Sequence, residues 1–221
     1  MYNHKVLLSL GAIATLYASS SAYALHGVEV ANHQDSRASI THVAADTLED
    51  GALKFVSSLT QKGIGVIENN GLSEEKRKAE FRKLLNKNFD MKTIGRFALG
   101  RYWKTSSKQE QKEYLKLFEN MIVEVYSKRF NDYNGQKIEV TSARPNGKSD
   151  ALVSSSIVPD SGPNIDVDWR VRKKKNGQYK VIDIMVEGVS MSLTQRSDFA
   201  SVIQRGGGKV EVLLAHLRPK E

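Results

Sequence analysis

Residues 89–126 read FDMKTIGRFALGRYWKTSSKQEQKEYLKLFENMIVEVY, and the rest of the chain is expected to fold around this stretch. Ser107 and Glu110 have the spacing of a capping box, which pairs the free N–H groups at the start of a helix. Apolar residues then recur at intervals of three and four, which predicts a long helix with one apolar stripe. The stripe consists of Tyr114, Leu117, Phe118, Met121, Ile122, Val125 and Tyr126. So wide a stripe must be covered, and we expect a sheet to cover it, with or without a ligand between them.

The sheet is expected after residue 135, where the hydrophobic period changes from that of a helix to the period of 2 typical of strands. Four strands are predicted, over residues 137–144, 150–158, 165–173 and 178–187. In the third strand Val167, Trp169 and Val171 alternate with charged residues, so one face is apolar and the other is wet. Short turns between the strands indicate an antiparallel meander.

Two strand faces lead to further expectations about packing. Trp169 is expected to face Phe118, Ile122 and Tyr126 of the long helix. The fourth strand carries apolar residues on both faces, so it is expected to be covered on both sides. Its expected faces are Val181 and Met185 on one side, and Ile182, Ile184 and Val186 on the other.

In the sequence, helices are predicted both before and after the strands. The first spans residues 47–69, Ser73 caps a second, and Asp90 is the expected N-cap of a short third. After the strands, residues 199–203 lie on a helix that ends at the glycines 206–208, and residues 210–217 form the last helix. The fold class is therefore α+β, with N-terminal helices packed on a four-stranded antiparallel sheet and short C-terminal helices.

The first 24 residues have the features of a secretory signal peptide. Lys5 precedes a short apolar run, and Ala22 and Ala24 are the small residues that signal peptidase requires, so cleavage is expected between Ala24 and Leu25. The run is too short to span a membrane. Residues 25–46 read as a flexible polar leader, and residues 47–218 as one folded domain.

Composition excludes some chemistry and leaves the partner open. The 221 residues contain no cysteine, which excludes disulfides, thiolate nucleophiles and cysteine-based zinc sites. A formal charge of +8 is compatible with nucleic acid, anionic lipid or acidic partners. The densest basic run, residues 172–175, is interpreted as a solvated hairpin tip, with docking to an acidic partner as the alternative.

Catalytic signatures are weak throughout the chain, and no enzyme is indicated. Ser190 follows Gly188 as in a nucleophile elbow, but Ser192 replaces the closing glycine. Asp166, Asp168 and Asp183 are interpreted as solvated residues or as partners of Arg170 and Arg172.

Several motifs together resemble the MlaC, or toluene-tolerance, family of periplasmic phospholipid-binding proteins. They are Leu99-Gly100-Arg101-Tyr102-Trp103, Asp168-Trp169-Arg170, Glu187-Gly188-Val189-Ser190 and Arg196-Ser197-Asp198-Phe199, in this order. The resemblance runs from about Leu48 to Leu217. It implies a curved sheet of the NTF2-like or cystatin-like kind, wrapped by helices.

The resemblance also implies a function. The protein would be a periplasmic carrier that moves phospholipid between the outer membrane and an inner-membrane ABC transporter, and so maintains outer-membrane lipid asymmetry. Phospholipid would be its cargo, with no cofactor, metal or nucleic acid. Its partners would be the MCE-domain ABC transporter and an outer-membrane lipoprotein–porin complex. Acyl chains are expected to contact an apolar cleft lined by Phe97, Leu99, Tyr102, Trp103, Phe118, Ile122, Tyr126, Val167, Trp169, Ile184 and Val189.

Two other interpretations of the same residues stay open. Wide apolar stripes can fill a core completely, which would make this an exported structural or adaptor domain without a ligand. A serine hydrolase that uses Ser190 is the second alternative.

The signal peptide gives the first testable prediction. N-terminal sequencing of the exported protein should begin at Leu25, because Ala22 and Ala24 occupy the two positions that the peptidase reads. An intact Met1, or a protein that stays in the membrane fraction, would contradict export as a soluble carrier.

Overall fold

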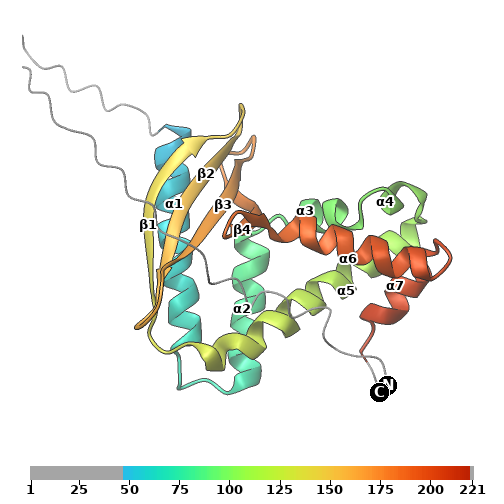
Figure 1. Cartoon of the computed structure of the whole chain (residues 1–221), viewed down its shortest axis with the longest axis horizontal. Coiled ribbons are helices and arrows are strands. Elements are labelled where there is room, and N and C mark those ends of the chain that lie inside the picture. Colours follow the sequence, from blue (N-terminus) through green and yellow to red (C-terminus); the bar gives the residue numbers. More distant parts are fainter. Residues whose placement is uncertain (1–46, 220–221) are drawn as a thin grey trace, which may run out of the picture. The chain divides into compact units, whose positions relative to one another are not determined.

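The computed structural model describes residues 47–219, so the expected signal peptide and leader lie outside the described residues. Helices precede and follow an antiparallel sheet (Figure 1), which confirms the α+β class. The first helices are α1 (Leu48–Ile67), α2 (Glu74–Asn88), α3 (Met91–Leu99), α4 (Tyr102–Thr105) and α5 (Lys108–Ser127), followed by a 3₁₀ turn over Lys128–Asp132. The strands are β1 (Lys137–Pro145), β2 (Asp150–Val158), β3 (Ile165–Lys173), β4 (Tyr179–Val186) and β5 (Val189–Ser190), and the last helices are α6 (Met191–Arg205) and α7 (Val210–Leu217).

The expected helix starts are confirmed. The backbone N–H of Glu110 donates to Ser107 Oγ (3.2 Å), and the backbone N–H of Ser107 donates to Glu110 Oε2 (2.7 Å), which completes the capping box of α5. Ser73 caps α2, and Asp90 caps α3. Each cap fixes where a helix begins and therefore which residues share its buried face.

The sheet has five strands in the order β1-β2-β3-β4-β5, one more than expected. The extra strand, β5, is only two residues long and pairs with the end of β4. The chain reverses through Glu187 (φ 50°) and Gly188 (φ 74°), and this left-handed turn brings Val189 opposite Val186. So short a strand gives little periodicity in the sequence.

One expectation for β4 was wrong. Trp169 pairs with Ile184, but Val171 pairs with Val181, so a β-bulge inserts one extra residue into β4. Paired residues share a face, and the bulge therefore places Val181 on the same face as Ile184 rather than with Met185. Strict alternation cannot predict this change.

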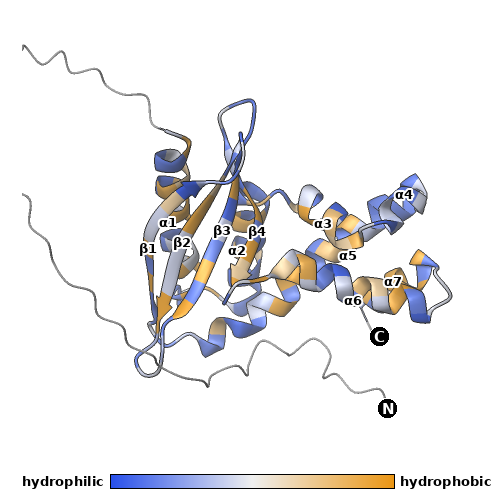
Figure 2. Cartoon of the chain, turned by 45° about the horizontal axis from the view of Figure 1, so that its top comes forward, coloured by the Kyte–Doolittle hydropathy of each residue, from blue (hydrophilic) through white to orange (hydrophobic). Residues whose placement is uncertain are grey.

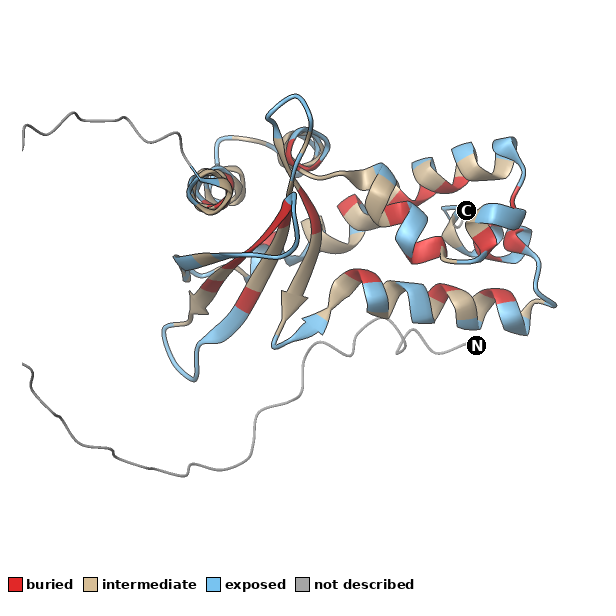
Figure 3. Ribbon diagram, turned by 90° about the horizontal axis from the view of Figure 1, so that it is seen from above, coloured by how far each residue is buried: buried red, intermediate tan, exposed pale blue. Residues whose placement is uncertain are grey.

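Buried apolar residues form two clusters, and this corrects the expected cover of α5. The sheet cluster joins Ala52 and Val56 of α1 to Ala151, Val153 and Val171 of the sheet. The helical cluster is built from the buried faces of α3, α4, α5, α6 and α7. Tyr114, Leu117 and Phe118 of α5 belong to the helical cluster, so helices cover this part of the stripe instead of a sheet. In Figure 3, α1 and α2, which run vertically in Figure 1, are seen end-on beside the sheet.

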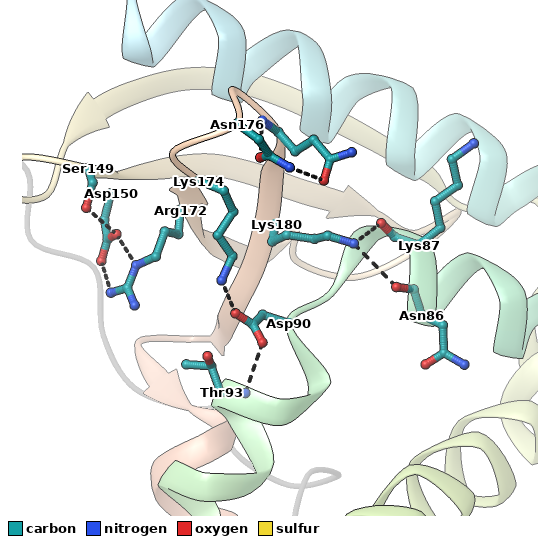
Figure 4. A network of polar contacts seen from close by, with 11 residues as sticks. Asn86, Lys87, Asp90, Thr93, Ser149, Asp150, Arg172, Lys174, Asn176 and Lys180 are labelled. Atoms are coloured by element: carbon teal, nitrogen blue, oxygen red, sulfur yellow. Dashed lines mark hydrogen bonds and ion pairs between the residues drawn. The ribbon is translucent and has the colours of Figure 1, made fainter.

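Phe89 and Asp90 connect the helices to the sheet. Phe89 forms a parallel bridge with Val181 of β4, and the Asp90 N–H donates to the Val181 carbonyl (2.9 Å). The Asp90 side chain accepts from the N–H of Thr93 (3.0 Å) and pairs with Lys174 of the β3–β4 hairpin (Figure 4). Burial alone would raise the pKa of Asp90, but these hydrogen bonds hold it below the usual value.

The basic hairpin is less solvated than expected. Arg172 donates two hydrogen bonds to Asp150 (2.6 and 2.8 Å), and Lys174 pairs with Asp90. Arg170 also donates to Asp150 (3.1 Å). Of the two alternatives for Asp166, Asp168 and Asp183, pairing with these arginines is therefore not realised, and each of the three accepts a hydrogen bond from a serine hydroxyl instead. Asp150 is buried at the start of β2, where the two arginines reach it across the sheet.

The close approach of α3 to α5 can be tested with glycine substitutions. A Cβ at Gly95 would lie 2.9 Å from Leu115 Cδ2 and 3.2 Å from Phe118 Cδ1. Overpacking costs about 1–3 kcal/mol and outweighs the helix propensity gained, so Gly95→Ala should lower the free energy of unfolding by about 1 kcal/mol. Gly65→Ala is the matched control, because nothing lies within 4 Å of its Cβ position. It should stabilise α1 by about 0.5–1 kcal/mol. Equal effects of both variants in urea denaturation would contradict a tight contact.

The charge on Asp90 gives a prediction for pH dependence. A carboxylate with a lowered pKa contributes stability that is complete above its unfolded pKa and is lost as the pH falls through its folded pKa. Asp90→Asn keeps a capping side chain but removes the charge that pairs with Lys174. It should cost about 1–2 kcal/mol at pH 7, and the difference from wild type should shrink as the pH falls through the folded pKa of Asp90, which lies below the usual value.

Urea denaturation at several pH values measures this difference. Asp160→Asn, in the exposed turn between β2 and β3, is the control and should change stability little at any pH. A constant penalty for Asp90→Asn from neutral to acid pH would show that shape, and not charge, is what matters at this position.

Candidate functional site

The apolar face of the sheet is the first feature that could bind a ligand. We call it the sheet face and define it by Val167, Trp169 and Val171 of β3 with Ile184 and Val186 of β4. Val167 pairs with Val186 and Trp169 with Ile184 across the two strands. The helix α1 packs mainly over β1 and β2, and Val171 is buried there. Further along the same face, Trp169, Ile184 and Val186 are only half-buried. Apolar side chains thus stay partly uncovered on β3 and β4, where Figure 2 shows hydrophobic and hydrophilic residues side by side along the strands.

Trp169 is held in one orientation by the sheet. Its indole N–H donates to Ser155 Oγ on β2 (2.9 Å), and the Ser155 hydroxyl donates to the Val167 carbonyl (2.9 Å). The only polar atom of the side chain is therefore paired, and the ring presents an apolar surface. Trp169 packs against the sheet cluster, whereas Phe118 belongs to the helical cluster, so the expected pairing of Trp169 with Phe118 was wrong.

Tyr126, in the last turn of α5, has an unusual environment for its hydroxyl. Burial raises the pKa of Tyr126, although the nearby Arg129 partly opposes this effect. Within residues 47–219 the hydroxyl makes no hydrogen bond, whereas the buried Tyr114 hydroxyl donates to the Gly95 carbonyl (2.9 Å). A phenol hydroxyl without a protein partner is available to an acceptor on a ligand. Sequence periodicity carries no signal for this difference between two tyrosines of one stripe.

The other expected lining residues fall into different environments. Leu99, Tyr102 and Phe118 are buried in the helical cluster, and Trp103 and Ile122 pack against it. Phe97 and Val189 are 42% and 50% exposed. Val167, Trp169 and Ile184 are together on the sheet face. The contact of these residues with lipid stays a prediction, and the sheet face is where several of them meet.

Ser190 has a structural role. Its hydroxyl donates to Asp183 Oδ2 (2.6 Å) and accepts from the Leu193 N–H (3.1 Å), which caps α6. Asp183 also accepts the N–H of Ser192 (3.1 Å), so both side chains hold the corner between β4 and α6. These contacts account for the Gly-Val-Ser motif without catalysis. In the part of the chain described here, no cluster of His, Asp and Glu could hold a metal, and no helix is long and apolar enough to cross a membrane.

A second feature was not predicted from the sequence. A groove of about 460 Å³ on α3, α4 and α5 is lined by Lys92, Arg96, Lys108 and Lys112 together with Trp103 and Leu115. We call it the cationic groove. Its basic residues recur at helical spacing, four apart on α3 and again on α5, and that spacing was the available signal. These residues are spread over 21 positions, so they form no compact basic run like that at 172–175.

Comparison with protein families adds to this geometry. The sequence model of the family described as MlaC protein matches residues 57–219, which is most of the described domain. The intermembrane phospholipid transport system binding protein MlaC of Haemophilus influenzae is 25% identical over 122 residues, 53% of this chain and 56% of that protein. Toluene tolerance protein ttg2D of Pseudomonas putida is 22% identical over 111 residues, 50% of this chain and 51% of that protein. The chain thus spans about half the length of these relatives.

A solved structure has the same fold. It is a phospholipid-binding protein from Ralstonia solanacearum in complex with a phospholipid, with a TM-score of 0.67 and 24% sequence identity. The match covers 75% of this chain and 94% of that one. At this level of identity the similarity establishes the arrangement of helices and sheet.

Proposed function

The chain belongs to the MlaC family, and from this premise we propose that it is a phospholipid carrier whose sheet face contacts the acyl chains of its cargo. The names of its relatives support this proposal. The H. influenzae protein is named as the binding protein of an intermembrane phospholipid transport system, and the R. solanacearum protein was solved with a phospholipid.

One observation of this chain carries the proposal. The sheet cluster and the helical cluster are packed, while Trp169, Ile184 and Val186 between the covered part of the sheet and its edge stay half-buried. Proteins bury large apolar side chains where they can, so a half-covered row on one sheet face indicates a surface kept for something apolar. The Tyr126 hydroxyl, which has no hydrogen-bond partner within residues 47–219, is a candidate donor to an ester or phosphate oxygen of a lipid.

The free energy of lipid transfer explains why a carrier needs such a surface. Each acyl CH₂ exposed to water costs about 0.8 kcal/mol, so a two-chain lipid of roughly 30 such groups would meet a barrier of about 24 kcal/mol. A protein surface as apolar as the bilayer removes most of this barrier. Transfer then becomes nearly neutral, and other components can set its direction.

The finer parts of the proposal concern location and partners. We infer that the protein acts in the periplasm after cleavage between Ala24 and Leu25. It would exchange phospholipid with an MCE-domain ABC transporter at the inner membrane and with a lipoprotein–porin complex at the outer membrane. Phospholipid is then cargo and not a cofactor, and no catalytic step is required. The competing proposal is an adaptor domain whose half-buried residues carry no ligand.

Lipid analysis tests the proposal directly. Protein purified without delipidation should release phospholipid on solvent extraction, detected by mass spectrometry. Trp169→Asp and Ile184→Asp should each fold but carry much less lipid, because a carboxylate against hydrocarbon is unfavourable. Leu193→Asp adds the same charge at a 53% exposed position on α6 and should carry normal amounts.

Stability measurements separate a ligand surface from a filled core. If Trp169 only fills a core, Trp169→Ala should cost about 3–5 kcal/mol through lost burial and a cavity. On a half-covered lipid surface the cost should be well below about 3 kcal/mol, and thermal melts followed by circular dichroism measure it. Empty wild-type protein with a full core penalty would favour the adaptor domain, and normal lipid in folded Trp169→Asp would move the binding surface elsewhere.

A further inference from the structure

The basic residues of this domain divide into a paired and an unpaired group. On the sheet side, Arg170 and Arg172 donate to Asp150, and Lys174 pairs with Asp90. Between α2 and α5, Lys78 and Arg82 pair with Glu124 and Glu119. Within residues 47–219, the four basic side chains of the cationic groove and the neighbouring Lys104 form no ion pair. Their charge is therefore available to a partner.

The geometry concentrates this charge at one place. None of the described residues that line the cationic groove is Asp or Glu. An adjoining hollow of about 290 Å³ is lined by Phe97 and Lys104 and shares Arg96 and Trp103 with the groove. Arg96 lies over the Trp103 ring, 5.4 Å from its centroid, so a cation and an aromatic ring form the ridge between the two hollows.

The groove is built on a fixed framework. The Gln111 side chain donates to the carbonyls of Trp103 (2.8 Å) and Ser106 (3.2 Å), which holds α4 against α5. Beside it, the Phe97 ring is 42% exposed, and the Arg196 guanidinium lies 5.3 Å from the ring centroid. A large aromatic side chain thus lies at the surface among cations.

We propose that this surface of α3, α4 and α5 docks onto a membrane that contains anionic phospholipid. Headgroup phosphates would bind in the cationic groove, and Phe97 would enter the interface between headgroups and acyl chains. Surfaces that bind at the membrane interface typically combine basic residues with exposed aromatic side chains. The inference rests on the proposed function only in that a carrier which exchanges lipid with membrane complexes works beside a bilayer.

Residue choice favours a membrane over an acidic protein. Protein interfaces are enriched in arginine and depleted in lysine, because lysine holds its water tightly and makes no bidentate contacts. The two hollows are lined by one arginine, Arg96, and by four lysines, Lys92, Lys104, Lys108 and Lys112. A flexible ammonium group suits a fluid layer of phosphates, whose positions adjust to the protein.

Vesicle sedimentation tests the proposal with protein purified in the form that cells produce. Vesicles of phosphatidylcholine mixed with phosphatidylglycerol should bind it, and vesicles of phosphatidylcholine alone should bind it far less. Binding should weaken as salt rises above about 0.1 M, where the screening length falls below about 10 Å. Each cation near an anionic surface contributes about a fivefold factor, so Lys108→Gln with Lys112→Gln should lower partitioning about 25-fold.

A control variant with the same change in net charge shows whether binding depends on the groove itself or only on the total charge of the protein. Lys148→Gln with Lys175→Gln removes two exposed lysines from the β1–β2 and β3–β4 turns and should leave partitioning within about twofold. In a Trp169→Phe background, Trp103 is the only tryptophan, since the chain has two, and its emission should shift to the blue on binding. Phe97→Ser should also reduce binding without changing the salt dependence.

Three results would overturn the proposal. The first is equal loss of binding in both double variants, which would reduce the effect to net charge. The second is unchanged Trp103 emission with vesicles bound. The third is no binding to anionic vesicles together with binding of poly-glutamate that depends on Lys108 and Lys112, which would assign the groove to an acidic protein. Vesicle binding through the groove by protein that carries no extractable phospholipid would support this inference while the proposed function fails.

Discussion

The contact between Asp90 and the edge of β4 connects the two packed regions of this domain. Asp90 uses its N–H to bind the Val181 carbonyl and its carboxylate to bind both the first turn of α3 and Lys174. The same residue thus binds the backbone of β4 and caps α3, the first helix of the helical cluster. Because α3 carries part of the buried face on which α5, α6 and α7 pack, the orientation of this cluster depends on how Asp90 is held. Lys180 strengthens the same junction by donating to the Lys87 carbonyl at the end of α2 (Figure 4).

Two separate cores have a functional consequence. A single core would draw Trp169 and Phe118 into the same packed interior, and the sheet face would be closed. Here α5 satisfies its stripe against other helices, and α1 lies mainly over β1 and β2. The sheet face on β3 and β4 is left half-covered, while Ser155 and Val167 hold the Trp169 ring in place. A surface that is apolar, ordered and partly open is suited to a ligand that must enter and leave.

The distribution of charge follows the same division of roles. Ion pairs on the sheet are built into the fold, since Asp150 is buried and its two arginines are needed to keep its charge stable. Hydrogen bonds from Arg172 and the nearby arginine charges hold the pKa of Asp150 below its usual range, against the effect of burial. On α3 and α5 the cations have no such structural task. Part of the positive charge of the described residues is thus gathered in the cationic groove, where it can act on a partner.

The sequence by itself determined the features that depend on neighbouring residues. Period-2 alternation set the bounds of β2 and β3, and the capping residues Ser73, Asp90 and Ser107 set the starts of three helices. The family followed from short motifs in a fixed order. These signals are local, because caps and strand alternation act over a few residues.

Only the tertiary structure decided which surfaces meet. Apolar periodicity says that the stripe of α5 is covered but not by what, so the helical cover of Phe118 was not predictable. The bulge that turns Val181 to the Ile184 face depends on strand register, which the β3 partner sets. Pairing of charges depends on contacts across the fold. For this reason two of the four cations in the conspicuous run at 172–175 proved to be paired within the fold, and the dispersed lysines of α3 and α5 came together on one surface.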